Sequence, residues 1–302
     1  MRLANNPPSL RGCRAKNLAG SWKPSGSCVS DVVRADQMSI LDLNNYRLLP
    51  IFLISLALLV AATEIGRWLG KRGGGRAEAN VPTLEGAVLG LLALMIGFTF
   101  AMALSRFEVH RDAVLDEANA IGSTALRARL LPAPNNAECL KLLKNYVQVR
   151  LDVTQHVLSP AELNAAIARS NEIQEALWRQ AKAVAATDNG MVPTGLFIQS
   201  LNEMFDNQAK HLSAIRDRVP NIVFVALYGI AAIASALAGY ASGLGRRPSQ
   251  FPVYVMIVLV CALILLIQDL NRPLTGFIEV SQQPMIETAK SINAYAEEDK
   301  HY

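Results

Sequence analysis

Four long apolar stretches punctuate the chain and predict four membrane-spanning helices. A spanning helix needs roughly 20 predominantly apolar residues. The first stretch, 48–62, is short, but residues 63–69 can extend it, whereas 86–104, 222–245 and 251–268 are uncharged throughout. Core helices of soluble proteins can be equally apolar. Four such stretches, each with Arg or Lys close to its end, instead favour a multi-pass membrane protein.

The region between the second and third stretches is polar and carries apolar residues at helical spacing. It predicts a first helix that continues from the second stretch to Leu131, and a second helix that Asn136 caps. A third helix begins at Pro160, after Ser159 in a capping box, and a fourth follows Pro193. Four amphipathic helices of this length are expected to pack as a bundle.

The predicted fold class is therefore all-α, with four transmembrane helices and a helical soluble bundle inserted between spans two and three. The tail after the fourth span is expected to hold a short helix that starts near Pro284. The predicted divisions are 1–46, a disordered or wrongly assigned N-terminal extension; 47–105, a transmembrane hairpin of spans one and two; 106–220, the soluble helical domain; 221–270, a transmembrane hairpin of spans three and four; and 271–302, the C-terminal tail.

The first 37 residues show no hydrophobic periodicity. They are either a disordered basic arm or a segment upstream of the native start, in which case Met38 begins the protein. Residues 1–37 contain six Lys or Arg and two Asp, so without them the net charge falls from +4 to 0. We expect Met38 to be the native start.

Composition and charge narrow the function classes. The chain is 51% hydrophobic and 18% charged, with a net charge of +4 and no basic stripe interleaved with aromatics, so nucleic acid is not an expected partner. The four cysteines and four histidines are scattered without metal or redox spacing. The sequence contains no P-loop, nucleophile elbow or dinucleotide motif. We therefore expect no enzyme, no catalytic residues, no metal site and no cofactor.

Small residues recur at a spacing of four within the apolar stretches. This spacing lets membrane helices approach closely. In the second stretch the small residues line one smooth face, which we expect to pack tightly, although glycine is also simply common in membrane helices. The predicted helix-packing residues are Gly86, Gly90 and Gly97 on this face, and Gly239 and Gly243 in the third stretch.

A second stripe on the same predicted helix carries larger apolar side chains. Its members are Leu89, Leu92, Ile96 and Phe100. Their spacing of three and four residues places them on one side of a helix. That side faces lipid, a neighbouring helix or a pore, and the pattern by itself leaves these three alternatives open.

Charged residues near the ends of the spans are spaced for ion pairs. Glu64 lies three residues before Arg67, so the two side chains share a helix face. Asp269 and Arg272 at the end of the fourth stretch have the same spacing, and we expect them to pair if the helix continues that far. Just past the second stretch lies an acidic stripe, which is either a solvated face or a vestibule that concentrates ions. It consists of Glu108, Asp112 and Asp116, with Arg106 and Arg111 beside it.

Three ordered segments resemble the bacterial bestrophin-like domain family. The first is GFTFAMALSRFEVHRDAVLDEANAIGSTALRARLLP, residues Gly97–Pro132. The second runs from Leu201 to Pro220, and the third from Gln268 to Pro284. The resemblance extends over about Leu48–Met285, around all four predicted spans.

The resemblance implies an architecture and a function. Bestrophins are pentameric anion channels with four spans and a helical cytosolic region, in which the second span lines the pore. The implied protein is thus a homo-oligomer that conducts inorganic ions through the lipid bilayer. The stripe Leu89, Leu92, Ile96 and Phe100 would line the pore, with Ile96 and Phe100 as its constriction. Arg106 and Arg272 would attract anions, and the sequence lacks an acidic cluster suited to a calcium clasp.

A function of another class remains open. The chain can instead be a membrane-anchored sensor or scaffold whose helical domain binds a protein partner. In either case we expect a bacterial inner (plasma) membrane protein. The resemblance places the soluble domain in the cytoplasm, whereas the positive-inside rule favours cytoplasmic short loops and hence an external domain. The basic residues of those loops are Arg67, Lys71, Arg72, Arg76, Arg246 and Arg247.

Overall fold

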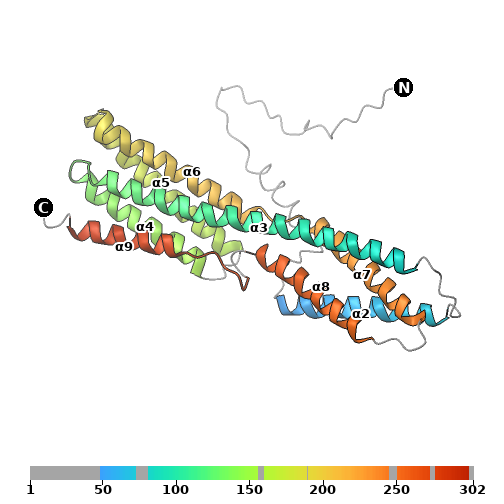
Figure 1. Cartoon of the computed structure of the whole chain (residues 1–302). Helices are drawn as coiled ribbons and strands as arrows, with labels where there is room; N and C mark the ends of the chain where they lie inside the picture. Colours follow the sequence, from blue (N-terminus) through green and yellow to red (C-terminus); the bar gives the residue numbers. More distant parts are fainter. Residues whose placement is uncertain are drawn as a thin grey trace, which may run out of the picture. The chain divides into compact units, whose positions relative to one another are not determined.

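The computed structural model describes residues 48–72, 81–155, 160–188, 190–244, 250–272 and 276–298. In these residues every regular element is a helix, which confirms the all-α prediction (Figure 1). The elements are α2 (Leu48–Arg72), α3 (Val81–Ala128), α4 (Asn135–Gln155), α5 (Pro160–Thr187), the π-helical turn η2 (Met191–Gly195), α6 (Leu196–Arg216), α7 (Asn221–Leu244), α8 (Phe251–Leu270) and α9 (Gln283–Glu298). The expected start at Met38 and the loop residues Arg76, Arg246 and Arg247 lie outside the described residues.

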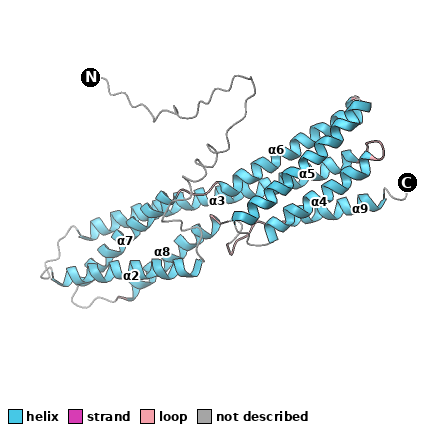
Figure 2. Cartoon of the chain, turned by 180° about the vertical axis from the view of Figure 1, so that it is seen from behind, coloured by secondary structure: helices cyan, strands magenta, loops and turns pink. Residues whose placement is uncertain are grey.

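Four helical segments are long and apolar enough to cross a membrane. They are α2, α3, the stretch from η2 through α6 and α7, and α8. The four expected spans are therefore present, and the chain is an integral membrane protein. The helices expected between the second and third spans are also present, as the second half of α3 and as α4, α5 and α6 (Figure 2).

Helix α3 is far longer than a bilayer requires. Its 48 residues extend about 70 Å at 1.5 Å per residue, against a hydrocarbon thickness of about 30 Å. The uncharged part, 86–104, can span the membrane, and the remainder continues without a break beyond it. Along its length α3 packs against α7 and α8, and also against α4, α6 and α9. One rigid helix therefore connects the apolar half of the chain with the polar half.

Helices α2 and α7 pack through reciprocal glycines. A Cβ added to Gly239 would overlap the backbone of Thr63, and one added to Gly243 would lie 2.6 Å from the carbonyl oxygen of Arg67. Gly66 and Gly70 on α2 meet the α7 backbone in the same way. From one contact to the next, the residue number increases by four on α2 and by four on α7. The two helices therefore run parallel, and their backbones touch.

Gly239→Ala is expected to destabilise the protein by about 1–3 kcal/mol, because the added methyl group must push α2 away from α7. Gly229→Ala is the matched control on the same helix, since a Cβ there meets nothing within 4 Å. The thermal unfolding midpoint of the purified protein measures both. Equal midpoints for the two variants would contradict the close contact.

The polar half of the chain is a bundle in which α9 takes part. Its core joins α3, α4, α5 and α6 through fully buried side chains such as Tyr146, Phe197 and Leu177. Met285 and Ile292 of α9 belong to the same core, and Thr288 donates a hydrogen bond to the carbonyl oxygen of Ala118 on α3 at 3.2 Å. The expected tail helix is thus a fifth helix of the bundle.

Candidate functional site

One face of α3 is left uncovered along the whole helix. The exposed large apolar residues on α3 fall within about 160° of its circumference, at 100° per residue. Phe98 in the apolar part is 64% exposed, and Leu126 near the far end is 50% exposed. We call this surface the open face, and its apolar members are Leu84, Leu91, Leu94, Phe98, Met102, Leu104, Val109, Leu115 and Leu126.

The predicted pore-lining stripe lies largely on the other side of α3. Leu92 is only 3% exposed, and Leu89, Ile96 and Phe100 are half-buried. These side chains pack toward the chain's own helices, and in a bilayer such packing is driven by van der Waals contact, because lipid is as apolar as the side chains. Leu92 is therefore enclosed within one copy of the chain, and pore lining by this stripe stays a prediction.

The small residues of α3 lie on the open face instead. A Cβ added at Gly86, Gly90 or Gly97 would meet no other heavy atom within 4 Å. No described helix of the chain therefore packs on these three glycines, unlike Gly239 and Gly243 on α7. The surface that sequence analysis expected to pack tightly is accessible to another molecule.

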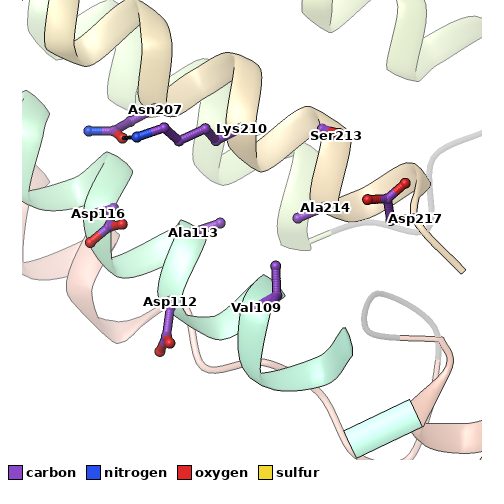
Figure 3. A pocket seen from close by; sticks show the side chains of 9 residues that line it. All are labelled: Val109, Asp112, Ala113, Asp116, Asn207, Lys210, Ser213, Ala214 and Asp217. Carbon is purple, nitrogen blue, oxygen red and sulfur yellow. Dashed lines mark hydrogen bonds between the residues drawn. The ribbon is translucent and has the colours of Figure 1, made fainter. Parts of the chain in front are cut away.

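A shallow groove of about 380 Å³ separates α3 from α6 just past the apolar part (Figure 3). Asp112 and Asp116 of α3 and Asp217 after α6 lie along it, and Lys210 donates a hydrogen bond to Asn207 at 3.2 Å. Two members of the acidic stripe, Asp112 and Asp116, thus line a groove that α6 completes.

The basic residues beside the acidic stripe are engaged by carboxylates. Arg106 reaches Asp217 at 3.4 Å, on the side of α3 that faces α6. Arg111 lies 3.3 Å from Asp112, and both side chains are exposed. The guanidinium of Arg106, an expected anion-attracting group, is therefore directed toward a carboxylate.

The charged residues at the end of α8 are arranged differently from the prediction. The carboxylate of Asp269 accepts hydrogen bonds from the backbone N–H groups of Phe277 at 2.6 Å and Ile278 at 2.9 Å. Among the described residues no ion pair joins it to Arg272. The reason is that α8 ends at Leu270, so the two side chains do not share a helix face. Arg272 is itself 4% exposed, which also differs from a role in attracting ions.

The pair at the end of α2 is formed. Arg67 lies 3.2 Å from Glu64, as its helical spacing indicates. The hydroxyl of Tyr254 on α8 also donates a hydrogen bond to the Glu64 carboxylate. The pair therefore links α2 to α8 as well as stabilising α2.

The bundle contains a buried polar layer that the sequence pattern did not predict. Glu117 of α3 is fully buried, and both of its oxygens are bonded. Arg150 of α4 approaches it at 2.7 Å and 3.0 Å, Nδ1 of His211 on α6 at 2.5 Å, and the hydroxyl of Tyr146 at 3.2 Å. His110, one helical heptad before Glu117, packs its ring 5.1 Å from that of His211. We call these five residues the polar layer.

The charges in the polar layer balance. Burial alone would raise the pKa of Glu117, but the hydrogen bond from His211 and the charge of Arg150 outweigh it, so the pKa of Glu117 lies below its ordinary value. The same carboxylate keeps Arg150 charged, with its pKa above the ordinary value against the effect of burial. One buried anion thus faces one buried cation.

A signal for the polar layer exists in the sequence. His211 lies seven residues after Met204 and four before Ile215, which are both apolar core positions of α6. Glu117 likewise lies between the core residues Val114 and Ile121. Polar residues at core positions of amphipathic helices normally have buried partners, so the pattern indicates a layer but not its pairing.

The fold defines a class: a four-span, all-helical membrane protein whose second span continues into a helical bundle. A model of the Bestrophin-like domain matches residues 52–285. The chain belongs to this Bestrophin-like family.

Solved structures share the fold. Two variants of a bacterial bestrophin homologue from Klebsiella pneumoniae match with TM-scores of 0.61 and 0.63, at 15% and 14% identity. The matches cover 81% and 83% of this chain and 97% and 99% of those chains. A structure described as a membrane protein variant matches with a TM-score of 0.59 at 14% identity, covering 82% and 98% of the two chains. No protein with a curated description matches the sequence.

Proposed function

We propose that the protein is an oligomeric ion channel of the bacterial inner membrane, in which α3 of each copy lies next to the conduction path. The observation that supports this most is the open face of α3. Its apolar side chains and glycines are uncovered in one copy, from the membrane part into the bundle. Copies arranged around an axis would cover such a face while leaving a path along it. The resemblance to bestrophins likewise implies an oligomer in which the second span lines the pore.

The candidate pore residues follow from exposure as well as from spacing. Ile96 and Phe100 are half-buried, so they lie at the border of the open face and remain candidates for a constriction. Phe98 is more exposed and joins them. Apolar constrictions of this kind gate by dewetting.

The charges on the open face favour cations. Three residues of this stretch are acidic: Glu108, Asp112 and Asp116. Between positions 108 and 116 of the sequence the only Lys or Arg is Arg111, which pairs with Asp112. Arg106 is directed toward α6. Acidic rings at a pore mouth attract cations and repel anions. We therefore propose cation conduction, in contrast to the anion conduction that the sequence resemblance implies.

Replacing both Asp112 and Asp116 with Asn is expected to lower the cation-to-anion permeability ratio by about twofold or more, because it removes two charges per copy from the mouth. Reversal potentials of the purified protein in liposomes under a salt gradient measure this ratio. The matched control replaces two acids of α4, the half-buried Glu138 and the exposed Asp152, with Gln and Asn, and should leave the ratio unchanged.

The outcomes separate the two parts of the proposal. Flux with an unchanged ratio in the Asp112 and Asp116 variant would contradict a cation-attracting mouth. An absence of flux from an assembled oligomer would contradict the channel itself.

A sensor or scaffold is the second candidate function. A groove of about 420 Å³ lies between α5 and α6. Its lining includes the rings of Trp178 and Phe205, 6.4 Å apart, and the amides of Asn171 and Asn202. Aromatic floors with polar rims are typical of protein-binding surfaces. A protein partner whose binding is lost in Trp178→Ala, together with an absence of flux, would favour this function.

A further inference from the structure

We infer that the polar layer is a proton-sensitive latch that holds α3 against α4 and α6, and that acidification releases it. The layer is separate from the open face, and the inference does not depend on whether the protein conducts ions. It begins at His110, which lies about 9 Å past the uncharged part of α3 at 1.5 Å per residue.

The first support is the environment of His110. Its side chain has no exposed surface, and neither ring nitrogen has a hydrogen-bond partner among the described residues. A neutral imidazole tolerates this arrangement at modest cost, but an imidazolium carries two N–H donors and a charge that require acceptors or water. Protonated His110 therefore fits only a state in which water reaches the ring.

The second support is the charge of the groups around His110. Three helices contribute the other residues of the layer: α3 carries Glu117, α4 carries Tyr146 and Arg150, and α6 carries His211. The carboxylate and the guanidinium already balance, so a proton on His110 leaves an unbalanced positive charge in a buried site. No second carboxylate among the described residues contacts the layer to offset it.

The neighbouring helices do not supply that offset. Glu175 of α5 and Glu287 and Lys290 of α9 are exposed. The side chain that α5 brings to the layer is the neutral Gln174, which contacts Tyr146 and also Gln208 of α6. Asp269 at the end of α8 is occupied by backbone N–H groups. A proton added to His110 therefore repels the charge of Arg150 across the α3–α4–α6 junction.

The direction of the pH effect follows from His110. Burial, with a further contribution from His211, lowers its pKa from 6.5 to about 4. Because the pKa is lower in the closed state than in an open one, the closed state is fully favoured above about pH 6.5 and loses its advantage as the pH falls toward 4. Within this window the opening constant should rise about tenfold per pH unit for one linked proton.

Hydrogen–deuterium exchange of the full-length protein in nanodiscs tests the latch. Between pH 7.5 and pH 5, peptides covering 107–118 and 204–215 should lose about 30-fold in protection after correction for intrinsic exchange rates. His110→Leu replaces the imidazole with an apolar side chain of similar size, so it should keep these peptides protected at pH 5. His301→Gln, which removes an imidazole elsewhere in the sequence, should respond as the native protein does.

A second variant keeps the test independent of packing defects. His110→Gln removes the titrating group while keeping a polar side chain, and it should also abolish most of the pH response. An equal loss of protection at pH 5 in both variants and in the native protein would overturn the inference. Loss of protection in both variants already at pH 7.5 would also overturn it, since His110 would then be a packing residue.

A flux measurement extends the test and rests on the proposed channel function. If α3 lines the path, ion flux in liposomes should change between pH 7.5 and pH 5 in the native protein and stay constant in His110→Leu. A protein without flux at either pH contradicts the channel but leaves the exchange result intact. A pH-dependent flux that persists in His110→Leu contradicts the link between the latch and the path.

Discussion

Arg150→Met is expected to lower the free energy of unfolding by about 3–5 kcal/mol, because it leaves the buried Glu117 carboxylate without its cation. The two side chains meet at 2.7 Å, and both are almost completely shielded from solvent. Denaturant unfolding of the purified protein, followed by loss of helical circular dichroism, measures the effect. Arg179→Met on the exposed side of α5 is the matched control and should change stability by less than about 0.5 kcal/mol.

The partner substitution determines whether the pair acts as a unit. Glu117→Leu combined with Arg150→Met removes both charges, so the double variant should recover part of the stability that Arg150→Met loses. Full recovery is not expected, since Tyr146 and His211 also lose a bonding partner. Losses that simply add in the double variant would contradict the coupling between Glu117 and Arg150.

Asp269→Ala is expected to destabilise the protein by about 2–4 kcal/mol. The substitution leaves the N–H groups of Phe277 and Ile278 without the carboxylate that accepts from both. Each lost hydrogen bond to this charged group costs about 1–2 kcal/mol at a part-buried site. Asp188→Ala is the matched control, because Asp188 accepts one backbone N–H, from Gly190, at an exposed site. The unfolding midpoint should fall markedly for the first variant and little for the second.

Combining Asp269→Ala with Arg272→Ala distinguishes two roles for Asp269. One is to accept the backbone N–H groups of residues 277 and 278, and the other is the ion pair with Arg272 that the sequence spacing indicates. The double variant should be no more stable than Asp269→Ala, since the lost contacts belong to the backbone that leads into α9. A recovery of stability on removing Arg272 would instead support a pair between Asp269 and Arg272.

The sequence by itself determined the helical content and the four spans. A segment of about 20 apolar residues must satisfy its backbone groups within the membrane, and a helix does so locally. The pair of Glu64 with Arg67 was also readable, because a spacing of three within one unbroken helix fixes the geometry. Family membership followed from three ordered segments, which the match over residues 52–285 confirms.

Only the tertiary structure decided which helix faces are covered. The glycines of α3 and those of α7 have the same spacing, yet Gly239 touches a backbone and Gly97 touches nothing within 4 Å. Asp269 and Arg272 match Glu64 and Arg67 in spacing, but the end of α8 separates them. The polar layer joins residues as far apart in sequence as His110 and His211, whose rings lie 5.1 Å apart. Local periodicity predicts whether a residue is buried or exposed. Which residue it contacts depends on how helices that are distant in the sequence pack together.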